Sequence, residues 1–288
     1  MAKKLIFGCG YLGKRVAKLW RQAGDTIYAV TRRADRAEEL RDSGLVPLIA
    51  DICQPDSLRD LPRVETVLFA VGYDRSSPQS IGQVYVGGLS NTLQALKPPV
   101  ERFIYTSSTG VYGQFDGRWV DENALCQPTR PGGVACIEAE RALLAHPIGR
   151  CAVILRLAGI YGPGRIPRVK QLQAGKAIAA PSEGYLNLVH VDDAARVVLA
   201  AEVRATGGTI YCVSDGQPVL RREYYEQLAC LTGSPPPTFA PPSPDSPASQ
   251  RAGSSKRVRN QRVLSELQVR LDYPSYREGL AGILRSGD

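Results

Sequence analysis

The first half of the chain alternates short apolar runs with stretches whose apolar residues recur at helical spacing. The apolar runs predict strands at Lys3–Phe7, Thr26–Val30, Leu45–Ala50, Glu65–Val71, Arg102–Thr106 and Cys151–Leu157. The helical spacing predicts helices at Val16–Ala23, Ala34–Arg41, Ile81–Leu96 and Cys136–Leu144. Helices that connect successive strands give right-handed crossovers and a parallel sheet covered on both faces. We therefore expect an α/β fold built on a doubly wound parallel sheet.

The pattern loosens in the second half. It predicts strands at Leu186–Val191 and Thr209–Val213 and helices at Asp192–Val203 and Arg222–Leu231. Residues 234–252 are rich in proline and serine, which predicts a flexible segment. Helical spacing returns around Val263 and again around Leu280. This half therefore predicts a smaller lobe that is interleaved with late strands of the sheet.

A glycine motif connects the first predicted strand to the first helix. It reads Gly8-Cys9-Gly10-Tyr11-Leu12-Gly13. The first glycine permits a tight turn, the second lets the backbone approach a pyrophosphate, and the third lets the helix pack closely on the strand. The N–H groups at the start of the helix, at and after Tyr11 and Leu12, favour an anion. The motif predicts a dinucleotide-binding Rossmann domain at residues 1–160, with a smaller substrate lobe at 161–288. A glycine-rich turn that binds nothing is the alternative.

The residues after the second strand bear on the choice between NAD and NADP. An NAD site usually has a carboxylate there for the ribose hydroxyls, whereas this chain has Thr31, Arg32 and Arg33. A carboxylate would repel a 2′-phosphate, and arginine binds one through charge-assisted hydrogen bonds. The sequence therefore favours NADP as the cofactor, with NAD as the alternative.

The ends of the next two strands complete the predicted cofactor site. Asp51 and Ile52 are placed to meet the adenine, because they follow the third strand. Ala70, Val71 and Gly72 follow the fourth strand and can pass close to the pyrophosphate and the nicotinamide ribose.

Further segments resemble the extended and atypical short-chain dehydrogenase/reductases, also called NAD-dependent epimerase/dehydratases. These segments are Tyr105–Gly113, Arg156–Gly164, Val189–Ala194 and Lys256–Asn260, and with the glycine motif and Asp51 they extend the resemblance over nearly the whole chain. The spacing G-x-G-x-x-G, in place of the commoner G-x-x-G-x-x-G of extended members, points to an atypical branch.

The resemblance implies roles for individual residues. It makes Ser108 the catalytic serine that hydrogen-bonds the substrate oxygen, with the Thr109 hydroxyl beside it for substrate binding. It places Arg165 on a substrate-side loop, and it implies that Lys256 and Arg257 bind the phosphates of a nucleotide-linked substrate. A solvated basic surface is the alternative reading of these cations.

The chain departs from the family at the catalytic helix. The family's Tyr-x-x-x-Lys pair supplies a tyrosine acid/base and a lysine that lowers its pKa. Aligned through Glu140, the two positions fall on Gly132 and Cys136, and neither residue can do this work. The substitute acid/base candidates are Tyr112, Tyr161 and Tyr185. We favour Tyr112 and Tyr161 because both follow predicted strands, where sites often lie. Packing of their rings is the alternative.

The composition of the chain limits which binding partners and which cellular location we expect. The formal net charge is +8, but no aromatic-studded basic groove accompanies it, so we expect no nucleic acid. We also expect no membrane span and no signal peptide, because no apolar run is long enough. The seven cysteines are scattered singly, which predicts neither disulfides nor a metal site. These features predict a cytoplasmic protein. The expected partner is a small-molecule substrate, and a homodimer is left open.

One histidine lies in a motif-like block, Val189–Ala194. We expect His190 to be a structural, hydrogen-bonded side chain rather than a catalyst. Asp192 or Asp193 is expected to cap the helix that starts there.

Two functions remain open at this point. The first is an NAD(P)-dependent epimerase, dehydratase or reductase that acts on a sugar-like or nucleotide-linked carbonyl with altered catalytic residues, which the segment around Ser108 favours. The second is a catalytically inactive NADP-binding regulatory or sensor protein, which Gly132 and Cys136 favour.

Overall fold

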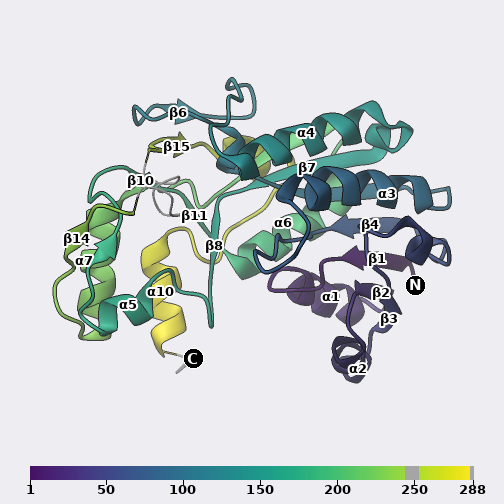
Figure 1. The fold of residues 1–288 in the computed structure, drawn as a ribbon, viewed down its shortest axis with the longest axis horizontal. Coiled ribbons are helices and arrows are strands. Elements are labelled where there is room, and N and C mark those ends of the chain that lie inside the picture. Colours follow the sequence, from purple (N-terminus) through teal and green to yellow (C-terminus); the bar gives the residue numbers. More distant parts are fainter. Residues whose placement is uncertain (244–252, 286–288) are drawn as a thin grey trace.

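A parallel sheet of seven strands forms the centre of the computed structural model, which describes residues 1–243 and 253–285 (Figure 1). The strands are β1 (Lys3–Phe7), β2 (Thr26–Thr31), β3 (Val46–Ile49), β4 (Thr66–Phe69), β5 (Arg102–Ser108), β7 (Ala152–Leu157) and β12 (Thr209–Val213). Their order across the sheet is β12-β7-β5-β4-β1-β2-β3, and every neighbouring pair is parallel. The predicted doubly wound α/β sheet is confirmed.

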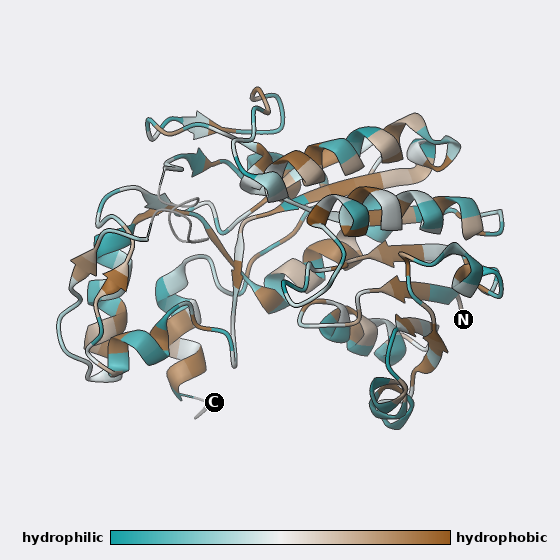
Figure 2. Ribbon diagram, in the orientation of Figure 1, coloured by the Kyte–Doolittle hydropathy of each residue, from teal (hydrophilic) through white to brown (hydrophobic). Residues whose placement is uncertain are grey.

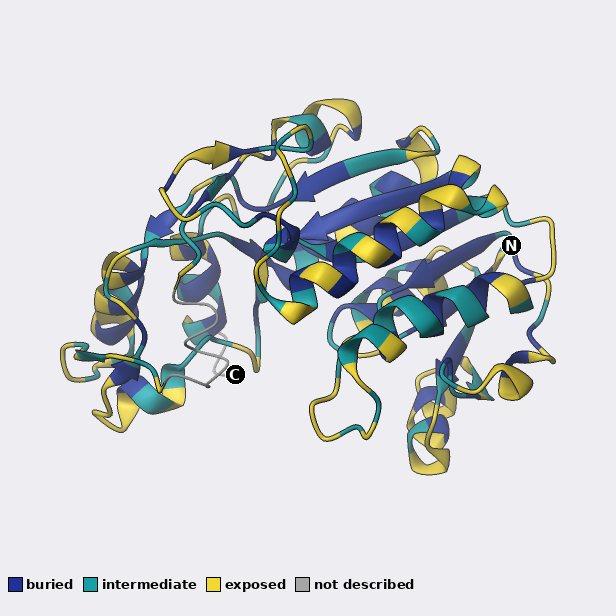
Figure 3. Cartoon of the chain, turned by 45° about the horizontal axis from the view of Figure 1, so that its top comes forward, coloured by how far each residue is buried: buried dark blue, intermediate teal, exposed yellow. Residues whose placement is uncertain are grey.

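Helices cover both faces of this sheet. One face carries α1 (Gly13–Gln22), α2 (Ala34–Asp42), α6 (Val191–Arg204) and α9 (Gln261–Glu266), and the other carries α3 (Gly88–Ala95) and α4 (Pro131–Ala145). Side chains alternate along each strand, so Leu5 and Phe7 enter the core under α3 and α4, while Ile6 enters the core under α1 and α6. The strands are therefore apolar on both sides, as the brown strands in Figure 2 and the buried strands in Figure 3 show.

A second group of elements lies beside the carboxyl ends of the strands, at the left of Figure 1. It contains β8 (Gly159–Tyr161), α5 (Val169–Gln173), β9 (Ile178–Ala179), β10 (Tyr185–Leu186), β11 (Leu188–His190), β13 (Val219–Leu220), α7 (Arg221–Thr232), β14 (Phe239–Ala240) and α10 (Tyr276–Arg285). Its own buried core includes Tyr161, Tyr224 and Leu280. The short strands β6 (Trp119–Val120) and β15 (Arg257–Val258) pair with each other above it.

Part of the segment predicted to be flexible is ordered. Phe239–Ala240 forms β14 and pairs with β9, because the Phe239 ring packs against Tyr225 with ring centroids 6.1 Å apart. The prediction for residues 234–252 is therefore wrong at this strand, and residues 244–252 lie outside the part that the structure describes.

Two predicted helices also differ at their ends. The helix expected at Cys136–Leu144 begins at Pro131, because proline suits the first helical position, where no N–H bond is needed. The helix expected at Ile81–Leu96 opens with a π-helical turn at Gln83–Gly87 before α3 begins.

A buried ion pair joins α4 to the sheet. Arg156 of β7 and Glu140 of α4 are 3% and 1% exposed, and Arg156 Nη2 lies 2.7 Å from Glu140 Oε2. Ser107 of β5 donates to Glu140 Oε1 at 2.5 Å. Arg156 Nη1 donates to the Tyr112 hydroxyl at 2.8 Å, and that oxygen lies 3.0 Å from Cys212 Sγ on β12. This Glu140–Arg156 network fixes the end of β5 against α4.

Replacing Glu140 with alanine should lower the free energy of unfolding by about 3–5 kcal/mol, because it leaves the buried Arg156 charge unpaired. Chemical denaturation measures this loss. Glu138→Ala is the matched control: Glu138 is exposed on the same helix, so its replacement should change stability by less than about 0.5 kcal/mol. Equal small losses in both variants would contradict a supporting role for the network.

Candidate cofactor and substrate site

A cavity of about 270 Å³ opens at the carboxyl ends of β1, β2 and β4. The predicted cofactor residues that line it are Gly8, Gly10, Thr31, Arg32, Asp51, Ile52, Val71 and Gly72. β1 lies between β4 and β2, and the chain proceeds from β1 to one side of the sheet and later returns to the other. Such a switch point is where open α/β sheets bind their ligands.

Two glycines of the motif are required by close packing, and the third leaves space. Gly8 has φ +88°, and a Cβ built on it would lie 2.3 Å from the Ala70 carbonyl oxygen. A Cβ on Gly13 would lie 2.5 Å from the Gly8 carbonyl oxygen. Nothing lies within 4 Å of a Cβ built on Gly10, which faces the cavity. Gly8, Gly13 and Ala70 thus shape the turn, and Gly10 leaves room for a ligand.

Three basic side chains follow β2, and they lie in different places. Arg32 lines the cavity, and its Nη2 lies 4.0 Å from Asp74 Oδ2. Arg33 does not line the cavity, and its guanidinium pairs with Asp35 at 3.1 Å. Arg36 lines the cavity and donates from Nη2 to the Cys9 carbonyl at 3.3 Å. The sequence analysis missed Arg36, although it lies one helical turn beyond Arg32.

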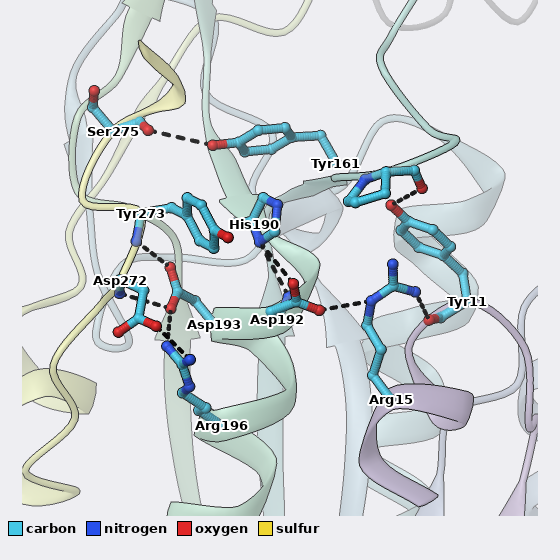
Figure 4. Close-up of polar contacts among 11 residues, drawn as sticks. Tyr11, Arg15, Tyr161, His190, Asp192, Asp193, Arg196, Asp272, Tyr273 and Ser275 are labelled. Carbon is cyan, nitrogen blue, oxygen red and sulfur yellow. Dashed lines mark hydrogen bonds and ion pairs between the residues drawn. The ribbon is translucent and has the colours of Figure 1, made fainter. Parts of the chain in front are cut away.

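The remaining motif residues lie outside the cavity lining. Leu12 is buried in the core beside α1. The Tyr11 hydroxyl donates to the Pro163 carbonyl at 3.0 Å, as Figure 4 shows. The guanidinium carbons of Arg15 and Arg165 lie 4.4 and 5.3 Å from the centre of the Tyr11 ring. Tyr11 therefore connects the glycine motif to the substrate-side loop that carries Arg165.

The same close-up shows what His190 does (Figure 4). His190 is 1% exposed, and its Nδ1 accepts from the Asp192 backbone N–H at 3.3 Å. His190 is thus the N-cap of α6, and the prediction that Asp192 or Asp193 caps this helix is wrong. Asp193 instead accepts from the backbone N–H groups of Asp272 and Tyr273, both at 2.9 Å.

Ser108 ends β5 in a half-buried position, while the neighbouring Thr109 is buried. The Ser108 Oγ accepts a hydrogen bond from the Gly110 backbone N–H at 3.0 Å. The part of the chain that the structure describes gives this hydroxyl no hydrogen bond to a basic side chain. Ser108 can therefore hydrogen-bond a ligand, but it has no partner that would make it a nucleophile.

The two tyrosines proposed as acid/base groups lie in the interior. Tyr112 is 1% exposed, and its hydroxyl bonds with Arg156; burial raises its pKa far above the usual value. Tyr161 is fully buried, donates to the Ser275 carbonyl at 3.3 Å, and likewise has its pKa raised by burial. This placement argues against the catalytic roles predicted for Tyr112 and Tyr161.

Gly132 and Cys136 occupy the first two turns of α4. A Cβ on Gly132 would meet only Ile81 Cδ1, at 3.4 Å. Burial raises the pKa of the Cys136 thiol to about 11, so the thiol is neutral at pH 7. Neither position supplies a proton donor of suitable pKa.

The neighbouring basic residues Lys256 and Arg257 point to different places. Lys256 is 5% exposed, and its Nζ donates to the Tyr112 carbonyl at 3.0 Å and to Ser254 Oγ at 2.9 Å. The Arg257 guanidinium carbon lies 5.1 Å from the centres of both the Trp119 and the Tyr185 rings. The two cations therefore do not form one phosphate grip.

Comparison with known proteins identifies the family. The family model described as "NAD dependent epimerase/dehydratase family" matches residues 5–213. The chain belongs to this family. The protein called YeeZ, from Escherichia coli, is 30% identical over 280 residues, which cover 95% of this chain and 97% of YeeZ.

Solved structures show the same architecture. A functionally unknown conserved protein from Silicibacter pomeroyi is 30% identical, with a TM-score of 0.81 and 99% of each chain covered. The UDP-glucose 4-epimerase of Thermotoga maritima, solved with UDP-glucose, is 20% identical, with a TM-score of 0.80 and coverage of 100% of this chain and 99% of that one. The second likeness shows the fold alone. Across the described residues, every helix is too short or too polar to cross a membrane.

The glycine geometry predicts opposite outcomes for two substitutions. Gly10→Val should leave the melting temperature within about 2 °C of wild type, because the side chain enters open space, but it should abolish dinucleotide binding. Gly8→Ala should destabilise the protein by about 1–3 kcal/mol, because alanine is strained at this φ and would meet Ala70. Thermal unfolding and fluorescence titration with NADPH and NADH measure both. Unchanged affinity of Gly10→Val for NADPH and NADH would show that Gly10 is not part of the dinucleotide site.

Proposed function

We propose that this family member binds NADP(H) and reduces or epimerises a carbonyl substrate beside Ser108. The observation that carries the cofactor part is the cavity itself, where Gly10 leaves room and the arginines Arg32 and Arg36 replace the carboxylate of an NAD site. Bound NADP(H) supplies a hydride donor or acceptor at its nicotinamide ring.

Different residues of the cavity would contact different parts of the cofactor. Gly8 and Gly10 would hold the pyrophosphate at the start of α1, and Asp51 with Ile52 would border the adenine. Val71 and Gly72 would lie along the nicotinamide ribose. The half-exposed Arg32 side chain is only loosely paired, so it can turn to a 2′-phosphate, and Arg36 is already held over Cys9.

Ser108 supplies the substrate side of this proposal. Its half-buried hydroxyl ends the strand that neighbours β4, where a carbonyl oxygen beside the nicotinamide could accept its hydrogen bond. The substrate we propose is a sugar-like or nucleotide-linked carbonyl, in line with the family and with the UDP-glucose enzyme among the structural neighbours.

A second function has its own supporting observation. The positions of the usual tyrosine and lysine in α4 hold Gly132 and Cys136. The hydroxyls of Tyr112 and Tyr161 are buried, so they do not supply the missing acid/base group. A protein that binds NADP(H) without turnover, as a regulator or sensor, would have this arrangement.

NADPH should bind at least tenfold more tightly than NADH, because two guanidiniums can contact the 2′-phosphate. Arg32→Asp should reverse this preference, and fluorescence titration measures both affinities. Arg33→Asp makes the same charge change on a residue that does not line the cavity, so the preference for NADPH should persist. Equal affinities of the wild-type protein for the two cofactors would refute the NADP assignment.

Turnover separates the two functions. With NADPH bound, the wild-type protein should oxidise NADPH in the presence of a panel of keto sugars and nucleotide-linked keto sugars, followed by absorbance. Ser108→Ala should slow this by about 100-fold or more, the usual loss when a group that stabilises an oxyanion is removed. The exposed Thr129→Ala is the control. A protein that binds NADPH but neither oxidises it with these ketones nor converts a nucleotide-linked sugar into its epimer would instead support the sensor function.

A further inference from the structure

Two cations lie near the turn that follows Ser108, and the function proposed above assigns no role to them. Arg130 immediately precedes α4 and is half-buried. A Cβ built on Gly110 would lie 3.3 Å from Arg130 Nη2 and 3.1 Å from Ser108 Oγ. The guanidinium and the serine hydroxyl therefore both lie beside Gly110, which has no side chain to separate them.

Lys256 approaches this region from the interior. Its Nζ donates to the carbonyl of Tyr112, the residue that follows the turn at Thr109–Val111. Burial and the positive charge of Arg130 together lower the pKa of Lys256 to about 8, so the amine is still mostly protonated at pH 7. We call Arg130 and Lys256 the cation pair.

Neither member of the cation pair has a carboxylate partner in the part of the chain that the structure describes. The Arg130 guanidinium also makes no hydrogen bond to a described residue, although its backbone carbonyl accepts from the Val134 N–H at 3.0 Å. The contrast with Arg156 is direct, because that buried guanidinium is neutralised by Glu140 at 2.7 Å. Two neighbouring cations without a counter-charge repel each other and are costly to desolvate. An anion placed between them would remove both costs.

We infer that the cation pair binds an anionic group of the substrate, a carboxylate or a phosphate, next to the carbonyl that Ser108 hydrogen-bonds. The carbonyl part rests on the proposed function, whereas the anion site does not require turnover. Arginine suits this role because its planar N–H groups can bind two oxygens of either anion at once.

This inference changes the substrate class in one respect. The resemblance implied that Lys256 and Arg257 together hold the phosphates of a nucleotide-linked substrate. The structure instead places the Arg257 guanidinium carbon 5.1 Å from the centres of both the Trp119 and the Tyr185 rings. Lys256 donates to the carbonyl of Tyr112, the residue after the turn that follows Ser108. The substrate would therefore be an acidic or phosphorylated carbonyl compound whose charge lies near the reacting carbon.

Calorimetric titration of the full chain saturated with NADPH tests the inference, because the bound cofactor closes the phosphate positions of the dinucleotide site. Oxalate and inorganic phosphate are the anionic probes, and oxamide is the neutral probe with the shape of oxalate. We expect one or both anions to bind and oxamide not to bind. Tighter oxalate binding would assign a carboxylate, and tighter phosphate binding a phosphorylated substrate.

Arg130→Gln should weaken binding of the preferred anion at least tenfold. Arg141→Gln removes an exposed arginine of α4 and should leave the affinity for this anion unchanged. Lys256→Gln should act like Arg130→Gln, but the residue is buried, so the Arg130 variant carries the test if the lysine variant fails to fold. Equal affinity for oxalate and oxamide, absence of anion binding, or unchanged anion binding in Arg130→Gln would overturn the inference.

Cofactor affinity is measured for every variant before the anions are added. A chain that does not bind NADPH would contradict the proposed function, and the titrations would then be made on the chain without cofactor. The anion site and the cofactor site can therefore fail separately.

Discussion

The buried ion pair between Glu140 and Arg156 is the contact on which the substrate side of this protein depends. It links α4 to β7, holds β5 through Ser107, and reaches the turn after Ser108 through the Tyr112 hydroxyl. A charge pair with so little exposure tolerates few geometries, because each lone pair and N–H group must be satisfied. The network thus sets where Ser108 and the start of α4 lie relative to each other.

The cofactor side is built on a different constraint. At the glycine motif, close approach of the backbone at Gly8 and Gly13 leaves no room for side chains, while Gly10 stays open. This close-packed turn has the geometry that a dinucleotide-binding glycine motif requires, and the chain belongs to the epimerase/dehydratase family. On the substrate side, Gly132 and Cys136 stand where the resemblance implies the acid/base pair, and the positive charge that we propose there comes from Arg130 and Lys256.

The sequence predicted the sheet and its strands, because apolar runs and a glycine motif are local signals. Eight of the predicted cofactor residues line the cavity, while Arg33 does not and Arg36 was not predicted. It failed where distant segments decide the environment of a side chain. Tyr112 is buried by contacts with Arg156 and with Cys212, which lies 100 positions away. Arg130 gave no signal, since only the folded chain brings it beside Ser108. Residues 239–240 read as a flexible loop because their partner strand lies far away in sequence.

A crystal structure of the protein with NADP⁺ would test the central claim, that this cavity places a 2′-phosphorylated dinucleotide against Ser108. The account predicts the pyrophosphate over Gly10, the 2′-phosphate within hydrogen-bond distance of Arg32 or Arg36, and the nicotinamide ring beside Ser108 and Gly132. A 2′-phosphate that contacts neither arginine, or a nicotinamide ring turned away from Ser108, would contradict it.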